Sequence, residues 1–164
     1  MTLDEKILYH LEQAQYCANE QGYGDIGSYA RSREVVAAIV LGHKIADTFS
    51  GADAFNEAGE PIEYKSTIGS RCSGSYTGIS VQPTWEEQER YLRDDKIAKY
   101  PEHYYNRFSN GKLVESWKMD GKDVYNILLP KLKKQFPTVL NKKDPRLNAT
   151  VTWGEIQKLG TKVV

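Results

Sequence analysis

The stretch Gly51–Lys65, GADAFNEAGEPIEYK, decides the fold because the spacing of its apolar residues changes from helical to extended. Residues 53–55 and 62–68 have the composition of strands, and the segment 56–60 between them has that of a turn. Before this stretch, apolar residues recur three and four positions apart, as they do on one face of a helix. We therefore predict a β-hairpin directly after two helices.

The rest of the chain adds further elements but no repeat, low-complexity segment or interdomain linker. In chain order we first expect a helix from Leu3 closed by Gly22, a helix over about 28–44, a strand at Phe49 and the hairpin. Next we expect a loop or irregular hairpin over 68–83, a helix over 84–100, and two strands within 103–119 joined at Ser109–Gly111. A helix over 123–136 follows, and then a tail of strand, helical turn and strand. This order predicts one α/β or α+β domain, residues 1–164, with a mixed central sheet flanked by helices.

The composition excludes several classes of protein. Lysine plus arginine and aspartate plus glutamate are balanced at 22 each, so no overall basicity points to a nucleic-acid partner, although basic groups gathered on one face would still bind phosphates. Cys17 and Cys72 lack redox or metal-ligand spacing, so we expect reduced thiols. The charged N-terminus lacks a signal-peptide core, and no window holds the roughly 20 apolar residues of a membrane span. We expect a soluble, cytoplasmic protein with no membrane partner.

Three residues of the hairpin can carry chemistry together. Glu63 and Lys65 lie two positions apart on one strand, so their side chains share a face, and the turn returns Asp53 to the side of Glu63. Carboxylate oxygens suit Mg²⁺, which polarises a phosphate and lowers the pKa of a bound water. Lys65 would hold or help deprotonate that water and offset charge on the phosphate. The backbone carbonyl of Tyr64 offers a further metal ligand.

A surface ion pair between Glu63 and Lys65, with Asp53 as a turn residue, is the alternative, because short Asp…Glu-x-Lys patterns are common by chance. Two features favour the site. Gly51 and Ala52 are small enough to let another backbone approach closely. The pattern also lies on a predicted hairpin next to a helix, which is the context that such a motif needs.

The same stretch resembles the PD-(D/E)xK nuclease motif, and in particular the PvuII-type restriction endonucleases. The residues that carry the resemblance are Asp53-Ala54, the turn Glu57-Ala58-Gly59, Glu63-Tyr64-Lys65-Ser66 and, more weakly, Gly24–Ile26 and Leu159–Val163. The resemblance implies a restriction-endonuclease-like core and a homodimer that cleaves double-stranded DNA with Mg²⁺, for which Mn²⁺ is expected to substitute. Asp53 and Glu63 would be metal ligands and Lys65 the catalytic lysine.

The recognition residues depart from that family. The histidines that follow the motif in these restriction enzymes are absent, and the comparable loop holds Ser73, Ser75, Tyr76 and Thr77. Their hydroxyl groups could bond phosphates or base edges, so we predict DNA contacts there, within a loop from Ser70 to Val81. A merely flexible surface loop is the alternative.

Three further candidates each have a structural alternative. Glu34, on the second helix, would support the metal site, or would be a solvated carboxylate paired with Arg31 or Lys44. Asp25 resembles a DNA-contacting residue of the family, or forms an Asx turn. The basic run from Lys131 to Arg146 would bind phosphates, or would be a solvated face. Within it, Lys142 and Lys143 are the predicted DNA contacts.

The sequence is compatible with several functions. A restriction-like or phage-type homing endonuclease is the leading expectation, because a two-fold dimer supplies one active site per DNA strand. A structure-selective junction resolvase or repair nuclease would share the chemistry and read the shape of DNA. A non-catalytic DNA-binding protein with the same fold is the alternative from a different class.

Overall fold

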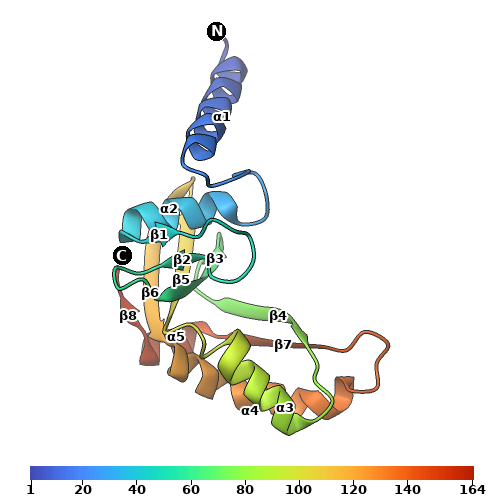
Figure 1. Cartoon of the computed structure of the whole chain (residues 1–164). Coiled ribbons are helices and arrows are strands. Elements are labelled where there is room, and N and C mark those ends of the chain that lie inside the picture. The colour runs from blue at the N-terminus through green and yellow to red at the C-terminus, as the bar shows by residue number, and fades with distance from the viewer.

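The computed structural model describes all 164 residues of the chain (Figure 1). The helices are α1 (Leu3–Glu20), α2 (Arg31–Leu41), α3 (Trp85–Tyr91), which continues into a π-helical turn (Leu92–Lys96), α4 (Gly121–Val139) and α5 (Trp153–Leu159). The strands are β1 (Lys44–Ile45), β2 (Ala54–Phe55), β3 (Pro61–Thr67), β4 (Gly74–Ser80), β5 (Glu102–Ser109), β6 (Lys112–Asp120), β7 (Arg146–Val151) and β8 (Thr161–Lys162).

The strands form two sheets. Six of them make a mixed sheet in the order β1-β2-β3-β5-β6-β8, in which only the β3–β5 pair is parallel. A separate antiparallel pair, β4 and β7, extends away from this sheet in Figure 1. The predicted α+β fold with a mixed sheet flanked by helices is therefore confirmed.

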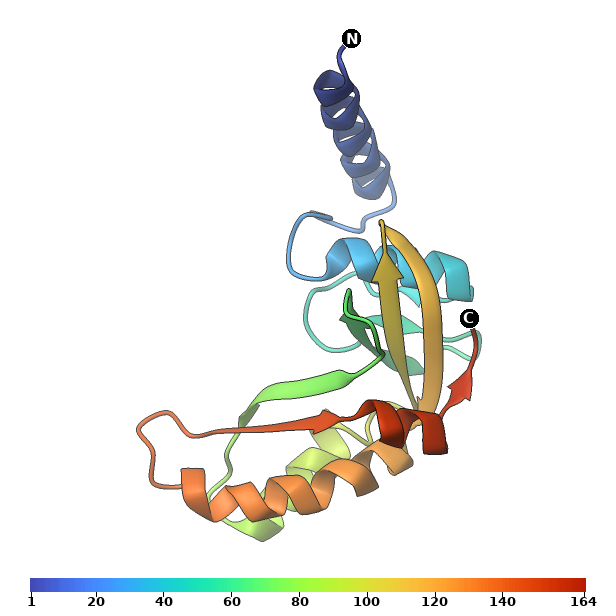
Figure 2. The ribbon, with the colours of Figure 1, turned by 180° about the vertical axis from the view of Figure 1, so that it is seen from behind.

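Each face of the large sheet has its own core. One face packs on α2, where Ala37 and Ala38 meet Ile62 and Tyr64 of β3. The other face turns toward β4, β7 and α4, and its core includes Tyr105 of β5. Figure 2 shows α3 and α4 on the far side of the β4–β7 pair from the large sheet. Strand β3 thus lies between two cores, so its alternate side chains enter different environments.

Helix α1 stands apart from both cores (Figures 1 and 2). It begins with a capping box in which Thr2 and Glu5 exchange hydrogen bonds, which satisfies donors that a helix start leaves free. Ala18 is its only buried residue. The side chain of Gln15 ties the end of the helix to the backbone of Gly24 and Ile26. Apart from Ala18, the apolar residues of α1 therefore face solvent in the single chain.

Several boundaries differ from the prediction. The second helix begins at Arg31 rather than near residue 28, and it ends where Gly42 takes a left-handed φ of 73°. Lys44 belongs to strand β1 instead of the helix. Phe49 lies in a bend and not in a strand, because no neighbouring strand pairs with it. The last long helix spans Gly121–Val139, longer than expected at both ends.

The segment predicted as a loop or irregular hairpin contains a regular strand, β4. Buried Tyr76 and Ile79 alternate with exposed neighbours, and the strand pairs with β7 about 70 residues later in the chain. The register shifts between Tyr76 and Ile79, where Gly78 has a φ of 66°. This bulge breaks the two-residue period, so the alternation was hidden in the sequence. The hairpin within 103–119 is confirmed, with Asn110 and Gly111 at positive φ in its turn.

Gly121, the first residue of α4, is a position where only glycine fits. A Cβ built there would overlap the backbone carbonyl oxygen of Tyr100, and the Gly121 N–H donates to Pro101 at 2.8 Å. We expect Gly121→Ala to lower the free energy of unfolding by about 2–3 kcal/mol, because the backbone must move to relieve the overlap. Urea unfolding measures this. Gly154→Ala in α5, where a Cβ meets nothing within 4 Å, is the matched control and should not destabilise the protein. Equal midpoints for both variants would contradict the expectation.

Candidate active site

Strands β2 and β3 bring Asp53 beside Glu63. Ala54 pairs with Ile62 across the hairpin, and the backbone N–H of Asp53 donates to the carbonyl of Ile62 at 3.0 Å. The backbone N–H of Tyr64 in turn donates to Asp53 Oδ2 at 2.7 Å. This bond fixes the Asp53 carboxylate next to the strand that carries Glu63, although Asp53 itself precedes β2.

Glu63 and Lys65 point to the same face of β3, as their spacing predicts. Lys65 Nζ donates to Glu63 Oε1 at 2.5 Å, with 17% of the Glu63 side chain and 23% of the Lys65 side chain exposed. Together with Asp53 they line a cavity of about 420 Å³. The full lining is Gly51, Asp53, Glu63, Lys65, Ser75, Tyr76, Thr77, Ile79, Asp95, Lys96, Ile97, Lys99 and Tyr100. The ion pair is thus part of a concave site and not an isolated surface contact.

The Asp53 carboxyl is electrostatically unusual. Burial raises its pKa, the neighbouring Glu63 carboxylate raises it further, and the pKa reaches about 7 although the Tyr64 N–H opposes the shift. Glu34 on α2 also raises it, so this helix carboxylate lies within electrostatic reach of the site. Two neighbouring carboxylates thus disfavour the charged form of Asp53, an arrangement that a cation would relieve.

Glu34 itself is paired with Arg31, as the alternative for this residue predicts, but its side chain is only 16% exposed and therefore not solvated. Arg31 is completely buried, and its Nη1 donates to Glu34 Oε2 at 3.3 Å. The same guanidinium donates to the carbonyls of Tyr23 and Ala46. Glu34 is therefore fixed beside the site by a buried cation, and only its weaker electrostatic effect on Asp53 links it to the metal role.

The donor set fits a Mg²⁺ ion bound by few protein ligands. No group of three or more His, Cys, Asp or Glu side chains lies close enough to hold a metal by itself. Asp53 Oδ1 and Glu63 Oε2 have no hydrogen-bond partner in the protein, whereas the other oxygen of each carboxylate does. Mg²⁺ is commonly held by one or two carboxylates, with water and substrate phosphate completing its octahedron. The residues present are compatible with such an ion.

The four residues expected in the recognition loop are divided by β4. Ser75 and Thr77 are exposed and line the cavity, whereas Ser73 is exposed outside it. Tyr76 is only 6% exposed, and its hydroxyl is bonded inside the protein. The prediction that the Tyr76 hydroxyl contacts DNA is therefore wrong, because the strand alternation turns this side chain inward.

Asp25, Lys142 and Lys143 are not brought to the cavity. Asp25 forms the Asx turn of the alternative, since its two carboxylate oxygens accept from the Gly27 N–H at 2.8 Å and the Ser28 hydroxyl at 2.9 Å. Lys142 and Lys143 are exposed in the turn between α4 and β7, beyond the Ser80 end of β4. The basic run is not one patch, because Lys131 is already paired with Glu155 at 2.7 Å.

Two lysines that the sequence did not single out lie at the cavity. Lys96 and Lys99 follow α3, are exposed and line the cavity together with buried Tyr100. The preceding helix carries several acids, so the segment read as acidic overall. The π-helical turn changes the direction of these side chains, and the local sequence does not predict such a turn. The pattern Lys-x-x-Lys next to Tyr100 is the one sequence signal for a basic edge of the cavity.

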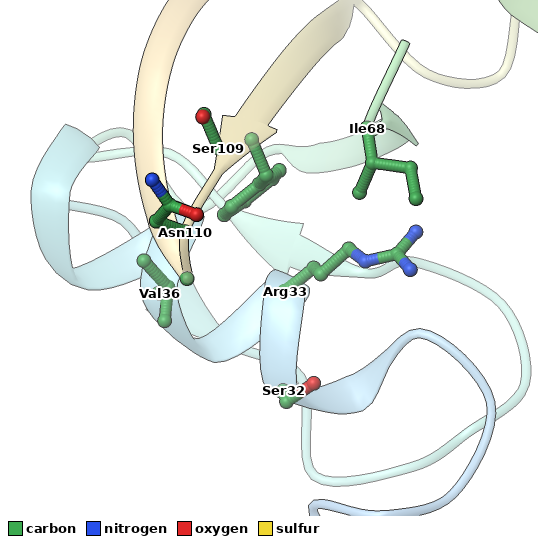
Figure 3. A pocket seen from close by; sticks show the side chains of 8 residues that line it. Ser32, Arg33, Val36, Ile68, Ser109 and Asn110 are labelled. Atoms are coloured by element: carbon green, nitrogen blue, oxygen red, sulfur yellow. The ribbon is translucent and has the colours of Figure 1, made fainter.

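A second concave surface, of about 510 Å³, lies between the start of α2, the end of β3 and the β5–β6 turn (Figure 3). Arg33 extends toward Ile68 there, while Ser109 and Asn110 lie across from it. It holds one cation and several hydroxyl and amide groups but no carboxylate. It therefore lacks the pair of carboxylates that the cavity around Asp53 provides.

Fold and site define an α+β protein with two carboxylates and a lysine converging in one cavity. No protein-family model and no curated protein sequence matches the chain.

None of the helices combines the length and the apolar run that a bilayer crossing needs. Both cysteines are free, Cys17 exposed and Cys72 buried.

Proposed function

We propose that the protein is a Mg²⁺-dependent endonuclease that hydrolyses phosphodiester bonds of double-stranded DNA. The observation that carries the proposal is the convergence of Asp53, Glu63 and the Lys65 ammonium in one cavity, with a free oxygen on each carboxylate. A bound Mg²⁺ would polarise the scissile phosphate and lower the pKa of a water. Asp53, Glu63 and the Tyr64 carbonyl would hold it.

Lys65 would act on the attacking water and on the phosphate, because its ammonium lies beside Glu63. Its ammonium donates to Glu63 Oε1, so a group arriving at Glu63 also comes within reach of Lys65. It would orient the attacking water and offset negative charge on the phosphate. Lys96 and Lys99 at the cavity edge supply local positive charge for a DNA strand, which compensates for the zero net charge of the chain.

Cleavage of supercoiled plasmid tests the proposal directly. We expect nicked and then linear product with Mg²⁺ or Mn²⁺, and none with EDTA. Discrete fragments from longer DNA indicate a restriction or homing enzyme, whereas preference for branched DNA indicates a resolvase or repair nuclease. Binding of DNA without cleavage under all of these conditions would leave a non-catalytic DNA-binding protein and overturn the proposal.

The enzyme would act as a homodimer, and α1 is the surface that supports this part of the proposal. Leu3 is 77% exposed, Ile7 60% and Leu11 61%, and with exposed Ala14 they form one stripe along about 17 Å of helix. Burying such a side chain contributes about 1.5–3 kcal/mol. The six large side chains of two copies can therefore offset an association cost of roughly 4–15 kcal/mol. A second copy fits because a two-fold pair supplies one site for each DNA strand.

Replacing the stripe should produce a folded monomer. We expect the wild type to sediment at twice the 18.6 kDa mass of the chain and the triple variant Leu3→Gln, Ile7→Gln, Leu11→Gln to sediment as a single chain. Glutamine keeps the helix propensity, so only the apolar contact is lost. The control is Glu12→Gln with Tyr16→Gln on the opposite face of α1. A monomeric wild type, or a triple variant that stays dimeric, would contradict the role of α1.

A further inference from the structure

Tyr76 lies directly beneath the lysine of the candidate site. Lys65 Nζ is 4.7 Å from the centroid of the Tyr76 ring, a distance at which an ammonium is attracted to the face of an aromatic ring. The Tyr76 side chain comes from β4, a strand of the other sheet, and crosses the face of β3 that carries Glu63 and Lys65. The proposed nuclease chemistry assigns nothing to this ring.

The hydroxyl of Tyr76 is bonded to the neighbours of both site residues. In the parallel pairing of β3 with β5, Glu63 stands beside His103 and Lys65 beside Tyr105. Tyr76 Oη lies 2.8 Å from His103 Nδ1 and 2.9 Å from Tyr105 Oη. His103 and Tyr105 are completely buried. One hydroxyl thus links the two β5 residues that are paired in register with Glu63 and Lys65.

The direction of these hydrogen bonds follows from the buried imidazole. His103 Nε2 lies 3.0 Å from the carbonyl oxygen of Ile97, which can only accept, so Nε2 carries the proton. Burial lowers the pKa of His103 to about 4, so the ring is neutral and Nδ1 accepts. Tyr76 therefore donates to His103, and Tyr105 donates to Tyr76. Each of the three hydrogens in this series of hydrogen bonds therefore has one acceptor, and the two bonds to its hydroxyl anchor the Tyr76 ring.

The packing of Lys65 and Tyr105 near the Tyr76 ring requires a glycine, Gly74, at the start of β4. A Cβ on Gly74 would overlap the Tyr105 ring and come to 3.0 Å from Lys65 Cγ. The aliphatic part of Lys65 therefore packs close to Gly74, while its ammonium lies over the Tyr76 ring. Because its stem and its charged end are both constrained, Lys65 loses the rotamer freedom that a lysine otherwise keeps.

We propose that Tyr76 is a positioning residue for Lys65: its ring fixes the ammonium beside Glu63, and its hydroxyl is anchored by His103 and Tyr105. The inference rests on the proposed function for its catalytic consequence. The position of the ammonium itself is a physical property that can be measured without catalysis. Tyr76→Phe keeps the ring and Tyr76→Leu removes it, so the two variants separate the ring from the hydroxyl.

The test combines a spectroscopic and a kinetic measurement on the full chain. With lysine labelled by ¹³C at Cε, the ring should move the Lys65 ε-CH₂ signal upfield of the other lysines, and Lys65→Arg identifies that signal by its loss. We expect the shift to persist in Tyr76→Phe and to vanish in Tyr76→Leu. In cleavage of a DNA duplex with Mg²⁺, kcat should fall roughly 10- to 100-fold in Tyr76→Leu at an unchanged KM, and less than about threefold in Tyr76→Phe.

Control variants and melting temperatures separate positioning from loss of fold. Tyr125→Leu, a partly buried tyrosine on α4, should leave kcat and the Lys65 signal unchanged. Absence of an upfield lysine signal in the wild type would overturn the inference even if the protein cleaves DNA, as would Tyr76→Phe behaving like Tyr76→Leu in both measurements. An upfield signal with the expected variant pattern in a protein that cleaves no DNA supports the placement of Lys65 and overturns the nuclease function instead.

Discussion

Lys65→Ala should abolish most DNA cleavage while leaving the fold intact. The ammonium is the only cation bonded to a carboxylate within the cavity, and removing one preorganised charge at a reacting phosphate costs about 10²–10³-fold in rate. The side chain already borders the cavity, so its loss enlarges a solvent-accessible space and the melting temperature should change little. Plasmid nicking under single-turnover conditions with Mg²⁺ measures the effect.

A matched lysine on the same sheet provides the control. Lys118 on β6 pairs with Glu102 on β5 at 3.2 Å, which resembles the Lys65–Glu63 pair in chemistry but lies outside the cavity. Lys118→Ala should therefore cleave as fast as the wild type. Lys65→Arg keeps the charge but not the compact ammonium, and should remain strongly impaired. Cleavage by Lys65→Ala at the wild-type rate would remove Lys65 from the site.

The part of the site that the sequence predicts is the part built by local contacts. Asp53, Glu63 and Lys65 lie within one hairpin, and their proximity follows from a two-residue period and a turn of five residues. Residues that reach the cavity through long-range pairing could not be found this way. Lys96 and Lys99 approach because β5 returns parallel to β3, and no periodicity in their own segment reports that crossover.

The fold shows the same division. Helices and the Asn110–Gly111 hairpin were predictable because caps and turn residues act within a few positions. Strand β4 was not, since its partner β7 is distant in sequence and Gly78 interrupts its alternation. The inward direction of Tyr76 cannot be predicted from its own segment for the same reason. Its environment depends on which way β4 faces, and pairing with β7 sets that direction.

The raised pKa of Asp53 has a consequence for stability that can be measured without any substrate. An aspartate in an unfolded chain has a pKa of about 3.9, whereas Asp53 in the folded protein has a pKa of about 7. Between these values the folded state binds more protons than the unfolded state. Stability therefore decreases as pH rises from about 4 to about 7, and the ionised Asp53 costs the metal-free protein free energy at pH 8.

Asp53→Asn should remove this cost, because the amide oxygen can still accept from the Tyr64 N–H but carries no charge. We expect the variant to be more stable than the wild type by about 2–4 kcal/mol at pH 8 in EDTA, and by much less at pH 5. Thermal unfolding at the two pH values measures the difference. Asp144→Asn, at an exposed carboxylate paired with Arg146, is the control and should show no such pH dependence. An Asp53→Asn advantage that is equal at pH 5 and pH 8 would contradict the raised pKa.

The same pair of proteins tests whether the carboxylates hold a metal. A divalent cation that binds the folded protein and not the unfolded chain stabilises it in proportion to the logarithm of its concentration. Millimolar Mg²⁺ at pH 8 should therefore raise the melting temperature of the wild type toward that of Asp53→Asn, while the variant itself responds little. The cation replaces the proton as the partner of Asp53 and Glu63, so binding should weaken at pH 5, where Asp53 is protonated. A melting temperature that Mg²⁺ shifts equally in both proteins would place the ion elsewhere and separate the unusual pKa of Asp53 from any metal.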